Sequence, residues 1–528
     1  MGIQHALTWI DFSVIAVYIV SLLSLGFWVS FRRKYSEDMF LGGRSFGWPN
    51  IGLSLFGTNV SPSMMISSAG VAYASGMVAA NMEWLAWIFL MILAMIFLPH
   101  YLNTKISTMP QFLKNRFGES SREFLSYYTL LSTMTLWLGG TLYAGGLLMS
   151  QLLGFPIWLS VALLLLIATS FTVTGGLAAV VITDSFQSVL MIVASVVLAS
   201  IGLYHVGGLN SLFTSVPQDY WHLFKPASDP EWPWYAVLLG YPVSGIWFWC
   251  TDQTIVQRAL SGRDLKQGQL GSLFAAFLKV LTPFIFFMPG IMCKILHPDL
   301  ESPDMAYTKM VTEYLPQGMV GLVVAVLIAA LISTVDSGLN SLSTIFTLDI
   351  YSKRIKPNAT NTEKNRMGKK VTIVGAVAAF ALAMGISAMP TPTLFERLLR
   401  IIQFLAPPLA SVFVVGVVWK GASSKASIMT LVLGGVASIA VGLLHMFDVQ
   451  PIANLHFMFV SFLIFAFLII FMVVVSLFTK DDSGSNFPTL LQASANLGAA
   501  SRSVWVAWGV LAAIMIALYV IFNPTFIF

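Results

Sequence analysis

The chain has 528 residues, of which 57% are hydrophobic and 10% are charged. Soluble domains average about 25% charged residues, so this composition excludes a soluble protein and indicates a helical membrane protein. The formal net charge of +5 would suit a nucleic-acid-binding protein, and only the positions of the basic residues can decide that question.

Apolar runs between polar breaks predict an all-α polytopic membrane protein with about fourteen transmembrane helices, each needing about 20 apolar residues. The predicted spans are 9–30, 47–73, 78–100, 122–151, 155–175, 180–205, 235–258, 268–293, 317–350, 370–388, 394–419, 426–446, 455–478 and 502–525. We expect residues 1–528 to form one integral membrane domain. It would consist of a leading helix (9–30), a core (about 47–419) and trailing helices (about 426–525).

The basic residues orient these spans. The connections that follow the odd-numbered spans hold 22 of the 28 Lys and Arg residues, whereas the even-numbered connections include acidic loops. By the positive-inside rule the basic connections face the cytoplasm, so both termini are expected on the non-cytoplasmic side. The chain is therefore predicted to be a multi-pass protein of the plasma (cytoplasmic) membrane. The basic excess is explained by topology, and nucleic acid is excluded as a partner.

Two predicted spans contain unusual helix breakers near mid-membrane. The second span carries Gly57, Asn59, Ser61, Pro62 and Ser63, and the seventh carries Gly240, Pro242 and Gly245. Irregular backbone at membrane depth occurs where it lines a cavity or is buried in protein. The two spans lie five apart and so cross in opposite directions, which is typical of an inverted repeat whose first helices unwind at the binding site. Simple proline kinks are the alternative.

Five ionisable residues lie at membrane depth, where charge is costly and marks functional sites. They are Glu83, Asp184, Asp252, Lys279 and Asp336. Glu83 and Lys279 are expected to neutralise each other or to bond a polar substrate, the alternative being an ion pair that only sets helix register. For Asp252 an ion pair with Arg258 at the helix end is an equal alternative to a ligand role.

The ninth span contains the sharpest cluster of oxygen donors. Ala330, Ser333, Thr334 and Ser337 share one helical face, and Asp336 lies at its edge. Hydroxyls, a backbone carbonyl and a carboxylate are hard ligands suited to a small cation such as Na⁺. The alternative is that the hydroxyls bond the preceding turn or pack against neighbouring helices.

Four stretches carry a family resemblance. They are LSLFGTNVS (53–61), WFWCTDQTIVQRALSGRDLKQGQ (247–269), FAAFLKVLTPFIFFMPGI (274–291) and AALISTVDSGLNSLSTIFTLDIYSKRI (329–355). The chain resembles the solute:sodium symporter family, and within it the sodium/glucose cotransporter branch, from about residue 10 to about 425. The resemblance implies a LeuT-like core of two inverted five-helix repeats and alternating access driven by Na⁺. No organic cofactor is expected.

The resemblance also implies which residues bind the coupling ion. The shared sodium site falls on Gly57, Val60, Ala330, Ser333 and Thr334, the first three through backbone carbonyls and the last two through hydroxyls. Some members of the family use a second sodium. Its ligands would fall on Asp184, Asp336 and Ser337.

The resemblance assigns the residues of the solute site less completely than those of the sodium site. Asn59, Glu83 and Lys279 match family residues that hydrogen-bond sugar hydroxyls, and Phe248, with Trp249 beside it, matches an aromatic residue beneath the sugar ring. Met64, Gly245 and Leu399 replace polar residues of the sugar carriers, and Arg400 follows directly. Because apolar replacements remove hydroxyl selectivity, glucose or galactose is a doubtful substrate. Arg400 would clamp an acidic group, unless it pairs with Glu396 one turn away.

The leading hypothesis is a Na⁺-coupled symporter that imports a sugar or related polyhydroxylated solute. The alternative within this class is a symporter for a carboxylate such as a uronic or sialic acid. A membrane-embedded enzyme is disfavoured, since the sequence offers no nucleophile–base or metal constellation, and two occluding broken helices disfavour a channel. The expected partners are the small-molecule solute and the lipid bilayer, and no obligate protein partner is expected.

Overall fold

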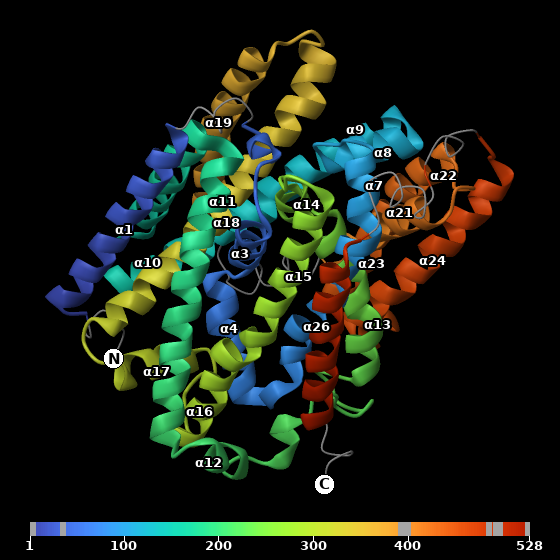
Figure 1. The fold of residues 1–528 in the computed structure, drawn as a ribbon. Helices are drawn as coiled ribbons and strands as arrows, with labels where there is room; N and C mark the ends of the chain where they lie inside the picture. Colours follow the sequence, from blue (N-terminus) through green and yellow to red (C-terminus); the bar gives the residue numbers. More distant parts are fainter. Residues whose placement is uncertain (1–6, 32–38, 389–402, 482–487, 489–499, 523–528) are drawn as a thin grey trace.

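The structure, a computed structural model, describes residues 7–31, 39–388, 403–481, 488 and 500–522. Within these ranges the chain is helical, and the only β-type pairings are two isolated bridges. Nine of the described helices are long and apolar enough to cross a membrane, accompanied by shorter apolar helices. The long helices lie side by side as one bundle (Figure 1). The all-α polytopic prediction is confirmed.

The elements follow in chain order, with η marking 3₁₀ and π segments. The first part holds α1 (Trp9–Ser30), η2 (Gly42–Arg44), α3 (Trp48–Asn59), α4 (Pro62–Ser75), η3 (Gly76–Ala80), α5 (Asn81–Trp84), α6 (Ala86–Ile92), η4 (Leu93–Phe97), α7 (Leu98–Asn103), α8 (Met109–Phe117), α9 (Glu119–Ser132), η5 (Thr133–Gly140), α10 (Thr141–Leu153), α11 (Ile157–Val206), α12 (Leu209–Thr214) and η6 (Gln218–Trp221). The second part holds α13 (Trp234–Gly245), η7 (Ile246–Thr251), α14 (Gln253–Leu260), α15 (Leu265–Thr282), η8 (Pro283–Phe287), α16 (Met288–Leu296), α17 (Met305–Tyr314), α18 (Met319–Ile345), η9 (Phe346–Ile355), α19 (Asn361–Ser387), α21 (Ala406–Val418), α22 (Ser424–Met429), η10 (Thr430–Gly434), α23 (Gly435–Met446), η11 (Ile452–Asn454), α24 (Phe457–Phe478) and α26 (Arg502–Ile521).

The predicted spans 155–175 and 180–205 are the two halves of α11. They meet at Gly176, whose backbone is non-helical with φ 54° and ψ −146°. A side chain cannot be accommodated there, because a Cβ on Gly176 would lie 2.4 Å from the Met39 carbonyl oxygen. Glycine therefore permits both the positive φ and the close approach of the chain that leads into α3.

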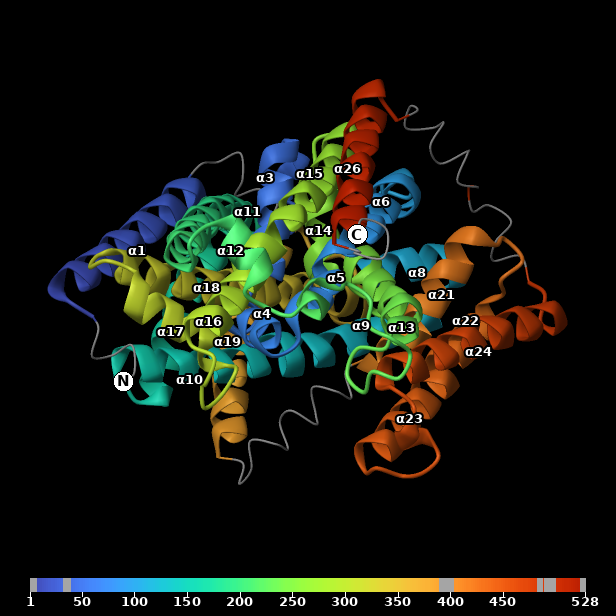
Figure 2. The ribbon, with the colours of Figure 1, turned by 90° about the horizontal axis from the view of Figure 1, so that it is seen from below.

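Helix α18 lies at the centre of the bundle, as Figure 2 shows from below. Nearly all of its side chains from Val320 to Ile345 are buried. It packs against α11, α1 and α3. The polar side chains of its middle turns therefore face neighbouring helices and not lipid, as polar groups at membrane depth require.

The predicted basic connections lie together at one side of the bundle. In Figure 1 the turns between α14 and α15 and between η9 and α19 are at the top, with α8, α9 and α22. Helix α12 and the turn between α16 and α17 lie at the opposite side, where α1 begins and α26 ends. This arrangement agrees with the alternation of basic and acidic connections in the sequence.

Candidate functional site

The first broken helix is formed by α3 and α4, which are separated at Val60 and Ser61. Val60 has extended backbone angles of φ −82° and ψ 108°. In a continuous helix the amide of Met64 would bond to the Val60 carbonyl, but here it donates to Ser61 Oγ at 3.1 Å. The cap leaves the Val60 carbonyl oxygen available to another partner. The predicted break in the second span is confirmed.

The second broken helix is interrupted later than predicted. The chain is helical through α13, including Pro242, continues as the π segment η7, and becomes extended only at Asp252. Asp252 then caps α14, because its Oδ1 accepts from the Thr254 amide at 2.8 Å. The expectation of a break at Gly240, Pro242 and Gly245 is therefore wrong. Membrane helices tolerate proline where neighbours satisfy the freed groups.

The glycines of α13 serve close packing instead. A Cβ on Gly240 would lie 2.4 Å from the Met458 carbonyl oxygen, and one on Gly245 would lie 2.7 Å from the Phe89 ring. Gly240 thus lets α13 approach α24. Gly245, a predicted solute residue, lies against Phe89.

Asp184 is the hub of a buried polar group that we call the sodium-side cluster, formed by Asp184, Arg258, Ser333, Asp336 and Ser337. Asp184 Oδ1 accepts from Ser333 Oγ at 2.5 Å, and Oδ2 forms an ion pair with Arg258 Nη2 at 2.9 Å. Neither side chain of this ion pair is exposed. Ser54 of α3 joins the cluster by donating to Asp184 Oδ2 at 2.6 Å. One carboxylate therefore ties α3, α11, α14 and α18 together.

Arg258 lies elsewhere than predicted. As one of the 22 basic residues of the cytoplasmic connections it was expected at the helix end, with a pair to Asp252 as one alternative. Instead its side chain is fully buried, its Nε donates to Ser54 Oγ at 2.8 Å, and its Nη2 donates to Ser337 Oγ. The feature that could have indicated a buried position is its place on the short helix α14, which begins directly after the second break.

Asp336 differs from Asp184 because it forms no ion pair within the described residues, although Arg258 lies near enough to interact with it electrostatically. It is fully buried, and its Oδ1 accepts from Ser337 Oγ at 3.2 Å. Its Oδ2 is buried without a hydrogen-bond partner in the part of the chain that the structure describes. A buried carboxylate oxygen without a partner carries a desolvation cost that a bound cation would offset. The orphaned oxygen fits the chemistry of a cation site.

The remaining predicted sodium ligands surround this cluster. Thr334 Oγ1 donates to the Ala330 carbonyl at 3.0 Å, and Ser337 Oγ donates to the Ser333 carbonyl at 2.5 Å. A Cβ on Gly57 would lie 3.3 Å from the Asp184 carbonyl oxygen, so α3 passes close to α11 at this point. The hydroxyls of Thr334 and Ser337 bond the preceding turn, which agrees with the structural alternative, whereas that of Ser333 donates to Asp184 on another helix.

Lys279 is the centre of a second buried group, the solute-side cluster, formed by Asn59, Glu83, Lys279 and Trp249. Its Nζ donates to Asn59 Oδ1 and forms an ion pair with Glu83 Oε2. The same Nζ lies 5.5 Å from the centroid of the Trp249 ring. The Lys279 side chain is 1% exposed and that of Glu83 is 13% exposed. The predicted neutralisation of Glu83 by Lys279 is confirmed, and Asn59 stands beside the first helix break.

Aromatic rings line this cluster on the side of the second broken helix. Phe248 packs edge-on against Trp249, with ring centroids 4.8 Å apart, and lies 5.6 Å from Trp137 of η5. Tyr241 packs edge-on against Phe89, with ring centroids 5.6 Å apart. Sequence reasoning missed Trp137 and Tyr241, whose apolar surroundings give no signal. Met64 lies on α4, one turn beyond the break.

Leu399 and Arg400 lie outside the described residues, as does Glu396. The predicted choice between a substrate-binding Arg400 and a pair with Glu396 therefore stays a prediction.

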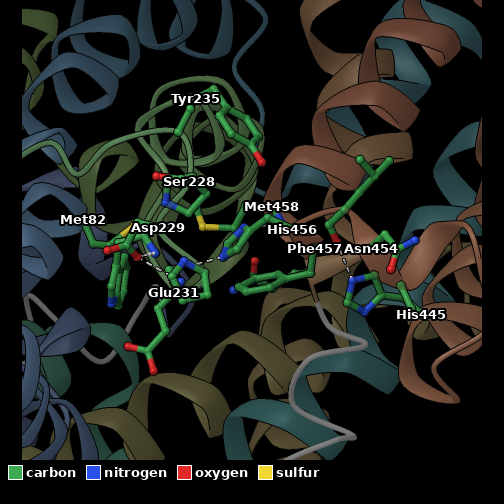
Figure 3. A pocket seen from close by; sticks show the side chains of 17 residues that line it. Met82, Ser228, Asp229, Glu231, Tyr235, His445, Asn454, His456, Phe457 and Met458 are labelled. Carbon is green, nitrogen blue, oxygen red and sulfur yellow. Dashed lines mark hydrogen bonds between the residues drawn. The ribbon is translucent and has the colours of Figure 1, made fainter.

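A cavity of about 910 Å³ was not anticipated from the sequence. It lies between the connection that leads into α13 and the start of α24 (Figure 3). Tyr235 and Phe457 contribute aromatic rings to its lining, and Glu231 and Asn454 contribute polar groups. Met82, the neighbour of Glu83 in the chain, lines one wall. Its volume lies in the range that holds a small molecule.

The fold is shared with known cation-coupled transporters. A structure of a Na⁺-coupled sialic acid symporter, substrate-bound and outward-open, superposes with a TM-score of 0.77 at 23% identity, covering 89% of this chain and 98% of that one. The nucleobase-cation-symport-1 family transporter Mhp1 superposes with a TM-score of 0.56 at 15% identity, covering 91% and 99%. The predicted LeuT-like fold of a secondary transporter is confirmed.

The sequence comparisons identify the family. The model described as the sodium:solute symporter family matches residues 39–434. The sodium/myo-inositol cotransporter 2 of Oryctolagus cuniculus is 33% identical over 521 residues, covering 90% of this chain and 77% of the relative. The sodium/glucose cotransporter 1 of the same species is 31% identical over 527 residues, covering 89% and 79%. The chain belongs to the sodium:solute symporter family.

Membership of this family decides among the functional classes. The chain is a sodium-coupled membrane cotransporter, with Na⁺ as the coupling ion, and not an enzyme. Broken helices near mid-membrane are a recurring feature of transporters built from inverted repeats.

Proposed function

We propose that the chain uses inward Na⁺ flow to import a neutral sugar or related polyhydroxylated solute by alternating access. The main support is the solute-side cluster, in which Lys279 is balanced by Glu83 and also bonds Asn59. A charge-balanced group of donors and acceptors beside aromatic rings suits a neutral solute with many hydroxyls. The myo-inositol and glucose named for the relatives are solutes of this kind.

Solute would reach the cluster through the cavity beside Met82. The cavity borders the side of the bundle where α13 and α24 begin, opposite the basic connections. The charge alternation supports a non-cytoplasmic position for that side and for both termini, in a plasma (cytoplasmic) membrane. Phe248 and Trp249 would close the solute from the other side, with Met64 and Gly245 shaping the site.

The coupling ion would bind between the first broken helix and α18. The proposed ligands are the carbonyl oxygens of Gly57, Val60 and Ala330 and the hydroxyls of Ser333 and Thr334. Bound Na⁺ would hold α3 against α18 and thereby favour the state that accepts solute. The freed Val60 carbonyl and the oxygen-rich face of α18 support this assignment.

A second cation site is proposed at Asp184, Asp336 and Ser337. The sodium-side cluster holds two carboxylates and one guanidinium, so its formal charge is negative when both carboxylates are ionised. One bound cation would balance that charge. The orphaned Asp336 Oδ2 supports this proposal.

Uptake into proteoliposomes tests the function directly. The panel is D-glucose, D-galactose, myo-inositol, D-glucuronate and N-acetylneuraminate, each with and without an inward Na⁺ gradient. We expect Na⁺-dependent uptake of a neutral member of the panel. Uptake indifferent to Na⁺ would refute symport, and uptake restricted to the two acids would replace the neutral solute by a carboxylate.

Ser333→Ala and Thr334→Ala test the ion site. Each should reduce Na⁺-driven uptake by about tenfold or more, because each removes one oxygen ligand from the proposed site. Ser341→Ala is the matched control, since Ser341 is a buried hydroxyl on the same helix, two turns away, whose oxygen has no hydrogen-bond partner among the described residues. Uptake that is unchanged in both test variants would contradict the assignment.

A further inference from the structure

Trp84 connects the two charged residues of the solute-side cluster. It follows Glu83 directly in the chain, and its Nε1 donates at 3.1 Å to the carbonyl oxygen of Val280, the neighbour of Lys279. The Trp84 side chain is 1% exposed. A single buried indole therefore fixes the distance between the backbone that carries Glu83 and the backbone that carries Lys279.

Glu83 lies where the helical backbone changes form. The 3₁₀ segment η3 precedes α5, and a turn at Leu85 separates α5 from α6. Hydrogen bonding continues across this turn, since the Leu85 amide donates to the Asn81 carbonyl at 2.8 Å. The side chains packed against this junction, Trp84 among them, therefore help to fix the position of Glu83.

The far side of the Trp84 ring is covered by the last helix. Tyr519 lies 6.0 Å from Trp84, edge to face, and Phe522 lies 5.4 Å from it. Tyr519 is in turn stacked on Phe224 at 6.0 Å, and Phe284 of η8 lies 5.8 Å from Trp84. Each aromatic contact of this kind contributes beyond the area it buries.

Helix α26, which carries Tyr519, also packs along α15, which carries Lys279. Figures 1 and 2 show α26 beside α15 in both views. The family model matches only residues 39–434, so α26 lies beyond the part of the chain that defines the family. It touches both elements that hold the ion pair.

We infer that two aromatic residues at the C-terminal end of α26, Tyr519 and the capping residue Phe522, position the Glu83–Lys279 pair through Trp84 and so set the affinity for solute. This inference rests on the proposed function. Tyr519 and Phe522 act as positioning residues through their rings. The hydroxyl of Tyr519 is buried and has no hydrogen-bond partner in the described part of the chain, so it contributes no bond to the pair.

The first test is a transport measurement on Tyr519→Ala and Phe522→Ala in proteoliposomes, with the panel solute that shows the strongest Na⁺-dependent uptake. We expect KM for that solute to rise about three- to tenfold, as the loss of one or two aromatic contacts allows. The Na⁺ concentration that gives half-maximal uptake should change less than KM, because the sodium-side cluster is on other helices. Ile516→Ala is the matched control on the same helix, since Ile516 is 63% exposed.

Tyr519→Phe separates the ring from the hydroxyl. It keeps the contact with Trp84 and should leave KM unchanged. If Tyr519→Phe raised KM as much as Tyr519→Ala, the hydroxyl would contact the solute and the positioning role would be overturned. If Tyr519→Ala did not fold, Tyr519→Leu would take its place, with thermal stability in detergent as the check on folding.

A second test needs no solute. Purified protein is treated with an amine-acetylating reagent, and the labelling rates of Lys279 and Lys309 are compared by peptide mass spectrometry. Lys279 is 1% exposed and Lys309 is 33% exposed. Tyr519→Ala should label Lys279 about three- to tenfold faster at an unchanged Lys309 rate, because loosening the pair frees its amine. Unchanged labelling together with unchanged KM would overturn the inference, whereas failure of Na⁺-driven uptake in the wild type would refute the proposed function alone.

Discussion

The two buried charged clusters of this transporter differ in how their charges are balanced. In the solute-side cluster one amine faces one carboxylate and one amide, and Glu83 keeps 13% of its side chain exposed. In the sodium-side cluster one guanidinium pairs with Asp184, while Asp336 is buried and forms no ion pair of its own within the described residues. Neither Asp184 nor Arg258 is exposed.

This difference in charge balance suits the two cargoes. A neutral solute can enter a balanced cluster by exchanging hydrogen bonds with Lys279, Glu83 and Asn59, without bringing a charge into the membrane interior. A cation is instead attracted to a cluster with surplus negative charge, where the low dielectric strengthens the interaction. Both clusters contact α3, the sodium-side cluster through Ser54 and the solute-side cluster through Asn59, which directly precedes the first break.

The largest expected effect follows from removing Arg258. Arg258→Met leaves Asp184 and Asp336 buried without any compensating charge, and breaking a buried ion pair in this way costs about 3–5 kcal/mol. We expect a lower thermal midpoint in detergent and near-complete loss of Na⁺-driven uptake. The double variant Arg258→Met/Asp184→Leu should recover stability without recovering uptake. Wild-type stability in the single variant would show that the pair does not hold the four helices together.

A smaller effect is expected in the solute-side cluster, where Glu83 is partly exposed. Lys279→Gln and Glu83→Gln should each raise KM for solute about tenfold or more, because each removes a charged hydrogen-bonding partner, worth about 1.5–3 kcal/mol. KM is measured by uptake at saturating Na⁺. The double variant removes both charges and should regain thermal stability while KM stays high. If its KM returned to the wild-type value, the pair would only set helix register.

Sequence reasoning succeeded where a local cost can be seen in the chain. Gly57, Asn59, Ser61 and Pro62 lie close together at mid-membrane and all disfavour a continuous helix, which placed the first break near Val60. Charges in apolar runs need partners, which paired Glu83 with Lys279. Both arguments depend on the free-energy cost of leaving a polar group without a partner in lipid. That cost is the same whichever helices pack around the group.

It failed where packing partners decide the outcome. Pro242 and Gly245 resemble a break, yet α13 continues past them because Phe89 and other neighbours fill the space beside the glycine. Arg258 lies in a basic segment that predicts a cytoplasmic position. Only the fold, which packs α14 against its neighbours, shows that its side chain is buried. Tyr519 lies far along the chain from Trp84, so no local pattern connects them. The sequence shows the sign of each charge and the position of each proline. It does not show which side chains will pack against them.

The smallest expected effect tests the surplus charge itself. Asp336→Asn removes that charge while keeping the size of the side chain, so the negative potential of the sodium-side cluster falls. Half-saturating Na⁺ should rise about three- to tenfold, which corresponds to about 0.7–1.4 kcal/mol of lost attraction at an effective dielectric well above that of dry protein. The measurement is initial uptake against Na⁺ concentration at fixed solute, where loss of a second ion would also lower the Hill coefficient. Thermal stability without Na⁺ should stay equal or increase, because an amide is cheaper to bury than an unpaired carboxylate.

Ser341→Ala on the same helix is the control. An unchanged Na⁺ curve would mean that Asp336 carries no charge that the ion senses, and the contrast between the two clusters would then reduce to their difference in exposure.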